Sequence, residues 1–160
     1  MASSQRFAFD ISALLTHAGL ALRTLRIAPN QVLFSQGEPA DSIFCLESGR
    51  VRLGVVSSLG HEAVITTFTA GDFVGTESLA PIAGKRQATA TAIEACAARM
   101  IRRDEMLRLM GQRHELAGLI FNSLMARSIQ TQSDLVDQLF NLRFLAPVLG
   151  ACTNARTQVN

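Results

Sequence analysis

One glycine-bounded segment and the arginine that follows it are the part of this sequence best suited to chemistry. Residues 71–79 read GDFVGTESL, and RQATA follows at 86–90. A glycine lets the backbone approach a ligand, a short capped turn then presents several N–H groups to one point, and a nearby arginine completes an anion site. A phosphate would fit there. Taken alone, the same residues are more typical of a glycine-rich hairpin corner with a solvated arginine.

Length and composition limit what surrounds this segment. The chain has 160 residues, of which 48% are apolar and 18% charged, and its formal net charge is +2. These values are typical of one compact domain with a real core and argue against disorder. The apolar stretches are too short for a membrane-spanning helix, so we expect a soluble protein. The balanced charge does not favour direct nucleic-acid binding.

The cysteines and the N-terminus indicate where the protein resides. Cys45, Cys96 and Cys152 are widely spaced and include no C-x-x-C pair, so we expect buried free thiols rather than disulfides or a zinc site. Residues 1–10 show no signal peptide. The sequence therefore predicts a cytoplasmic protein.

Evenly spaced glycines predict an all-β domain in the middle of the chain. Between residues 22 and 101, five glycines recur every 11 to 13 residues and separate short apolar or alternating runs. That rhythm is typical of a small sandwich or barrel. The expected strands are residues 22–27, 32–35, 42–46, 51–56, 63–68, 88–93 and 97–101.

Helices are expected on both sides of the strands. Asp10 would cap a short helix that ends at Gly19, and Asp104 would cap another that ends at Gly111. Residues 112–140 then predict one helix about 42 Å long. One face carries Leu116, Ile120, Leu124, Ser128, Thr131, Leu135 and Leu139. This stripe predicts either a seam with a second copy of the chain or a face folded back onto the strands.

Several motifs in order resemble the cyclic-nucleotide-binding sensor domain of the Crp/Fnr transcription regulators. They are FSQGEPADSIF at 34–44, ESGRVRL at 47–53, GDFVG at 71–75, RQATA at 86–90 and SDLVDQLFN at 133–141. The resemblance covers residues 22–141 and implies an eight-stranded jelly roll, a double-stranded β-helix, with flanking helices. We expect an N-terminal helical segment (1–21), the jelly-roll sensor domain (22–111), a long dimerisation helix (112–141) and an irregular tail (142–160).

The resemblance also implies roles for individual residues. In nucleotide-binding members the phosphate lies on the turn that starts at Gly75 and pairs with the arginine at the place of Arg86. A glutamate after that glycine accepts the ribose 2′-hydroxyl, and a small hydroxyl residue follows the arginine. Here those two places hold Thr76 and Gln87. Loss of the charged acceptor would cost about 1.5 to 3 kcal/mol, roughly one to two decades in affinity.

Three ligand hypotheses therefore stay open: a cyclic nucleotide such as cAMP or cGMP, another small anionic ligand, and no small ligand. Glu77 would be a poor substitute for the ribose acceptor because one residue in a helical turn is a rotation of about 100°. Ser128 and Thr131 would touch the purine or only set the register of the helix pair. The candidate ligand-binding residues are Gly75, Thr76, Glu77, Ser78, Arg86, Gln87, Ala88, Ser128 and Thr131, and the candidate dimer residues are Leu116, Ile120, Leu124, Leu135 and Leu139.

The sequence predicts neither direct DNA binding nor catalysis by this chain. The resemblance implies a winged helix-turn-helix domain after the dimer helix, whereas 19 residues follow Asn141. We expect DNA to be reached only through a domain that this chain lacks, and the rival interpretation is a ligand-free dimerisation module. His17, His61 and His114 fall in three different elements, with no H-x-H pair. We therefore expect neither a metal nor an enzyme.

Overall fold

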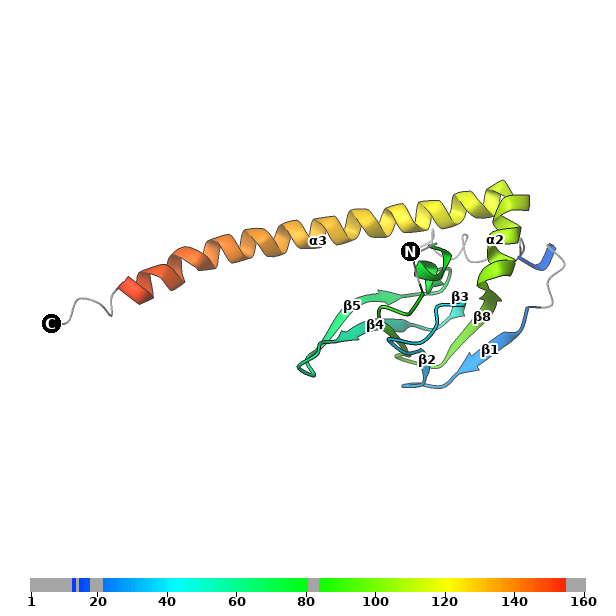
Figure 1. The fold of residues 1–160 in the computed structure, drawn as a ribbon, viewed down its shortest axis with the longest axis horizontal. Coiled ribbons are helices and arrows are strands. Elements are labelled where there is room, and N and C mark those ends of the chain that lie inside the picture. The colour runs from blue at the N-terminus through cyan, green and yellow to red at the C-terminus, as the bar shows by residue number, and fades with distance from the viewer. Residues whose placement is uncertain (1–12, 14, 18–21, 81–83, 155–160) are drawn as a thin grey trace. The chain divides into compact units, whose positions relative to one another are not determined.

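The computed structural model describes residues 13, 15–17, 22–80 and 84–154, with side chains described as far as residue 137. After helical residues 13 and 15–17, eight strands precede two longer helices in this part of the chain (Figure 1). The strands are β1 (Thr24–Ile27), β2 (Val32–Phe34), β3 (Ser42–Ser48), β4 (Val51–Val56), β5 (Glu62–Phe68), β6 (Phe73–Val74), β7 (Thr89–Ala92) and β8 (Cys96–Arg102). The 3₁₀ turn η1 (Thr76–Leu79) follows β6, and the helices are α2 (Arg103–Gln112) and α3 (His114–Asn154).

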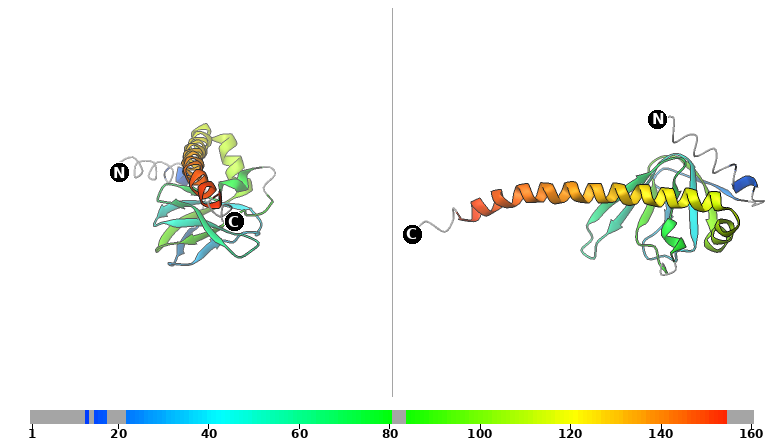
Figure 2. Two further views of the ribbon diagram at one scale, coloured as in Figure 1. Left: turned by 90° about the vertical axis from the view of Figure 1, so that its left-hand side faces the viewer. Right: turned by 90° about the horizontal axis from the view of Figure 1, so that it is seen from above.

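The strands form two antiparallel sheets. One has the order β1-β8-β3-β6 and the other β2-β7-β4-β5. Chain neighbours such as β1 and β2 lie in different sheets, so the chain passes repeatedly from one sheet to the other around a shared interior (Figure 2). This is the jelly-roll arrangement that the motifs predicted.

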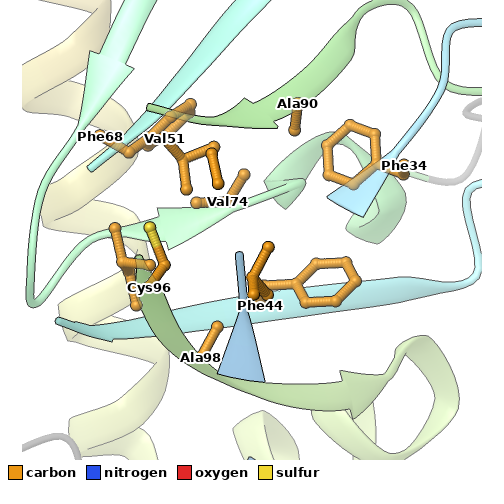
Figure 3. Packing of buried hydrophobic residues seen from close by; sticks show 11 residues of the cluster. Phe34, Phe44, Val51, Phe68, Val74, Ala90, Cys96 and Ala98 are labelled. Carbon is orange, nitrogen blue, oxygen red and sulfur yellow. The ribbon is translucent and has the colours of Figure 1, made fainter. Parts of the chain in front are cut away.

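The main core fills the space between the two sheets. Phe34, Val51 and Ala90 from one sheet meet Phe44 and Val74 from the other (Figure 3). Phe34 and Phe44 stack with ring centroids 5.9 Å apart. Because side chains alternate along a strand, the sheet that contains β3 sends every second residue into this core.

The remaining β3 residues pack on the opposite face of that sheet. Ile43 and Cys45 are buried in a second cluster, together with Met106 and Leu109 of α2. Both faces of β3 are therefore covered, which explains why its first five residues are all buried. A strand buried on both faces needs a continuous apolar run rather than alternation, and residues 43–46 supply it.

The predicted strands are confirmed with small shifts at their ends. All seven expected runs overlap a strand of the structure. The eighth strand, β6, was missed because it has only two residues, Phe73 and Val74, between Gly71 and Gly75. So short a run has no periodicity, and it pairs with β3 through tertiary contacts.

The helix boundaries need several corrections. Asp104 is not a cap: α2 begins one residue earlier, and Asp104 lies in its first turn, where a negative charge favours the helix dipole. Gly111 is helical, and Arg113 separates α2 from α3. In the N-terminal segment, residues 13 and 15–17 are helical, whereas the predicted boundary residues Asp10 and Gly19 lie outside the described residues.

The predicted irregular tail is wrong for most of its length. The α3 backbone stays helical to Asn154. Residues 141–146 are mostly good helix formers with no glycine, so nothing ends the helix at residue 141. Pro147 removes one backbone donor without ending it.

The chain divides into two units, residues 1–121 and 122–160, so α3 contributes to both. In the first unit Leu116 and Ile120 are buried in the cluster with Ile43 and Phe73. Their assignment to a dimer seam is therefore corrected: the first turns of α3 fold back onto their own sheet, where apolar surface is available to them. In the second unit Leu124 and Leu135 are exposed, and the Leu139 side chain lies outside the described ones.

Candidate ligand site

The turn after β6 forms around Gly75. This residue has φ 85°, in the left-handed region, and its carbonyl accepts a hydrogen bond from the Ser78 N–H at 3.1 Å. A Cβ at this position would lie 2.6 Å from Nη1 of Arg86 and 3.3 Å from the Phe34 ring. Glycine is therefore required twice, for its conformation and for the close approach of Arg86. No side chain caps η1.

Arg86 is buried, so the interpretation as a solvated arginine is wrong. Its Nη2 donates to the carbonyl of Ser42 at 2.5 Å and to the Ser42 hydroxyl at 3.2 Å. Its Nη1 donates to a carboxylate oxygen of Glu77 at 3.1 Å and approaches the Gly75 carbonyl at 3.4 Å. The guanidinium carbon lies 4.0 Å from the centre of the Phe34 ring. These contacts fix the position of the Arg86 guanidinium inside the domain and stabilise its charge there.

Two buried polar atoms at this turn have no hydrogen-bond partner among the described residues. They are Nε of Arg86 and the hydroxyl oxygen of Ser78. A buried donor without an acceptor costs about 1–3 kcal/mol, so such atoms often mark a place where a ligand or water supplies the missing contact. The turn thus combines a buried cation with unused hydrogen-bonding capacity.

The other predicted residues at the turn behave differently from one another. Glu77 faces Arg86, while Thr76 is half-buried at the first position of η1. Gln87 is exposed, and its side-chain amide donates to the Lys85 carbonyl, away from Arg86. Ala88 is buried. The structure therefore brings Gly75, Glu77 and Arg86 together and leaves Gln87 outside.

Ser128 and Thr131 lie in the second unit. Both are exposed on α3. Their predicted contact with a purine remains a prediction, because each unit is described by itself.

Three residues of the site were missed by sequence reasoning. Phe34 and Ser42 belong to a motif already quoted, but Ser42 is 44 positions from Arg86, and no local pattern indicates that contact. Arg103, the first residue of α2, donates from Nε to the Ser78 carbonyl at 2.6 Å. This contact ties η1 to α2, and only the folded chain brings the two together.

Cysteine and metal chemistry receive no support from the described part of the chain. Cys45 and Cys96 are buried and free. Burial, with a smaller contribution from the Glu47 carboxylate, raises the pKa of the Cys45 thiol to about 12, so it is neutral at pH 7. Among the described residues, no three His, Cys, Asp or Glu side chains gather as metal ligands. No helix in this part is long and apolar enough to cross a bilayer.

The fold and this turn define a class of protein. Residues 24–113, more than half of the chain, match the family model of the cyclic nucleotide-binding domain, and the chain belongs to that family. Among curated proteins it is similar to the CRP-like cAMP-activated global transcriptional regulator of Mycobacterium tuberculosis, with 29% identity over 108 residues. That match covers 68% of this chain and 48% of the relative, so the chain spans about half the length of the curated relatives it matches.

Solved structures show the same fold. The c-di-GMP responsive global regulator CLP of Xanthomonas campestris superposes with a TM-score of 0.71 at 19% identity, over 84% of this chain and 65% of that one. The catabolite activator protein of Thermus thermophilus gives 0.64 at 24% identity, over 82% of this chain and 58% of that one. The curated relatives that it matches are transcriptional regulators.

Proposed function

We propose that this chain is the ligand-sensing domain of a Crp/Fnr-type transcription regulator and that it binds a small anionic ligand, with cAMP and cGMP as first candidates. The observation that carries the proposal is the buried guanidinium of Arg86 at the Gly75 turn of a cyclic nucleotide-binding domain. Arginine recognises phosphate through its fork of N–H groups. The chain would act in the cytoplasm without catalysing a reaction.

The signal would leave the site through helices. Arg103 connects the Ser78 carbonyl of η1 to the start of α2, and α2 leads directly into α3. A ligand that shifts η1 would therefore bias the position of α2 and the packing of α3 in a homodimer. Any effect on DNA would pass through a further domain.

A ligand-free dimerisation module is the second candidate. It is supported by Arg86, whose hydrogen bonds to Ser42, Gly75 and Glu77 are made inside the protein, and by Thr76 at the place where family members hold glutamate. Nucleotide titration separates the two functions.

We expect weak binding of cAMP or cGMP to the natural chain and tighter binding to Thr76→Glu. The added carboxylate would accept the ribose 2′-hydroxyl, which corresponds to a gain of about 10- to 100-fold in affinity. Isothermal titration calorimetry measures both chains. Thr67→Glu, a change at an exposed threonine of β5, is the matched control and leaves the affinity unchanged.

The outcomes separate the two assignments. No heat and no thermal shift at millimolar nucleotide in any of these chains would remove the nucleotide-sensing function. If the natural chain binds but Thr76→Glu does not tighten the complex, Thr76 is not at the ribose position.

We expect the chain to dimerise through the exposed apolar face of α3. Leu124 and Leu135 lie about 20° apart around the helix, and both are exposed in the single chain. Burial of such a face stabilises a helix pair. Sedimentation at micromolar concentration is expected to show a dimer that Leu135→Glu dissociates by at least about tenfold, because a carboxylate in an apolar seam is costly.

Ala126→Glu is the control for that experiment. Ala126 is exposed and lies about 180° around the helix from Leu135. A natural chain that sediments as a 17.3 kDa monomer, or equal effects of the two changes, would contradict the seam.

A further inference from the structure

This inference rests on the proposed ligand-sensing function. The Glu77 carboxylate occupies the position beside the Arg86 guanidinium that an anionic ligand needs. Arginine has five N–H donors, and two belong to each terminal nitrogen. Nη1 is directed to Glu77 and the Gly75 carbonyl, and Nη2 to the carbonyl and hydroxyl of Ser42. Only the N–H at Nε has no acceptor. A phosphate that takes two N–H groups of Arg86 must therefore displace at least one acceptor of the protein.

Glu77 is the acceptor that can leave. The Gly75 and Ser42 carbonyls are backbone groups, and Ser42, the first residue of β3, is held in the sheet by its pairing with Arg102 of β8. The Glu77 side chain extends from a four-residue 3₁₀ turn and is 33% exposed, whereas the Arg86 side chain is 1% exposed. The carboxylate is thus the more exposed partner of the pair, and it can move into solvent without breaking any backbone hydrogen bond of the sheets.

We propose that Glu77 is an internal competitor for the Arg86 guanidinium: its carboxylate satisfies the cation in the free domain, and a phosphate-bearing ligand binds by replacing it. The exchange substitutes one anion for another, so the contact to Arg86 adds less net affinity than it would in the absence of Glu77. Glu77 consequently lowers the affinity for simple anions and favours ligands that make further contacts with the domain. This role differs from that of the ribose acceptor, whose position in this chain is held by Thr76.

The test compares Glu77→Gln with the natural chain and with Glu94→Gln. The Glu94 carboxylate forms an exposed ion pair with Arg50, so the control removes the same charge at a site unrelated to Arg86. Calorimetry measures the affinity for cAMP, and the thermal shift is measured with inorganic phosphate against chloride at equal ionic strength. We expect Glu77→Gln to bind cAMP about tenfold more tightly and to gain a larger shift from phosphate. Glu77→Asp, which keeps the charge on a shorter side chain, provides an intermediate value if Glu77→Gln does not fold.

The two probes keep this inference separate from the proposed function. If phosphate stabilises Glu77→Gln more than the other chains but cAMP binds none of them, the competitor role stands and nucleotide sensing fails. If cAMP binds all chains equally, nucleotide sensing stands and the competitor role is overturned. If neither probe affects any chain, both are overturned.

Discussion

Replacing Arg86 by methionine is expected to lower the free energy of unfolding by about 2–4 kcal/mol and to abolish binding of anionic ligands. In the natural chain Arg86 donates a hydrogen bond to the carbonyl of the buried residue Ser42. Methionine has no donor, so this carbonyl loses that hydrogen bond. Methionine keeps the contact with Phe34, since a thioether also packs well on an aromatic ring. The loss therefore comes from hydrogen bonds and charge rather than from a cavity.

The expected loss of stability is smaller than the loss for a fully buried ion pair. Removing one partner of a buried ion pair costs about 3–5 kcal/mol when the other charge stays buried. Here Glu77 is partly exposed and can be hydrated, and the unpartnered Nε disappears with the arginine. The hydration of Glu77 and the removal of the unpartnered Nε both reduce the loss of stability, so the expected value falls below the upper part of that range.

Urea unfolding followed by circular dichroism measures the change. Arg50→Met is the matched control because Arg50 pairs with Glu94 on the surface, where such a pair contributes at most about 1 kcal/mol. An equal stability loss in the two variants would mean that the Arg86 contacts contribute nothing beyond an ordinary surface pair.

Gly49→Ala is expected to destabilise the domain by about 2–5 kcal/mol. Gly49 lies in the turn between β3 and β4 with φ 83°, where an alanine pays a conformational cost of about 1–2 kcal/mol. A Cβ there would also lie 2.6 Å from the Ala95 carbonyl oxygen and 2.9 Å from Cα of Cys96. These are backbone atoms at the start of β8, so they cannot move aside as a flexible side chain would.

Gly60→Ala separates the two parts of that cost. Gly60 has φ 82°, but a Cβ would meet nothing within 4 Å, so this variant carries the conformational term alone. We expect it to lose about 1–2 kcal/mol, clearly less than Gly49→Ala, in the same urea experiment. If the two variants lose the same stability, the β3–β4 turn absorbs the clash and the close packing against β8 is not important.

The two variants separate the roles of the residues around the site. Arg86 is both structural and a ligand candidate, so its loss should lower stability and binding together. Gly49 lies next to Cys96 in the core between the sheets, so its replacement should lower stability alone. A Gly49→Ala protein that is stabilised by low temperature should therefore still bind any ligand that the natural chain binds.

Much of the fold could be predicted from the sequence because its determinants are local. Regularly spaced glycines and short alternating runs mark strands and turns, and seven of the strands were located in this way. The resemblance placed Gly75 at the phosphate turn, and the structure shows that a Cβ there would lie 2.6 Å from Nη1 of Arg86. The two-residue strand β6 and the ends of α2 and α3 depend on tertiary contacts and were misplaced.

The sequence by itself determined the positions of most strands, because these depend on residue type and spacing, and its resemblance to the Crp/Fnr sensor domains indicated the family and a role for Arg86 at the Gly75 turn. Only the tertiary structure decided what Arg86 does. Its partners Ser42 and Glu77 come from β3 and η1. Because the Arg86 guanidinium is buried, its charge must be paired with groups inside the protein and not with solvent. Folding likewise directed Leu116 and Ile120 into their own sheet while Leu124 and Leu135 stay exposed, since a helical stripe does not specify which surface will cover it.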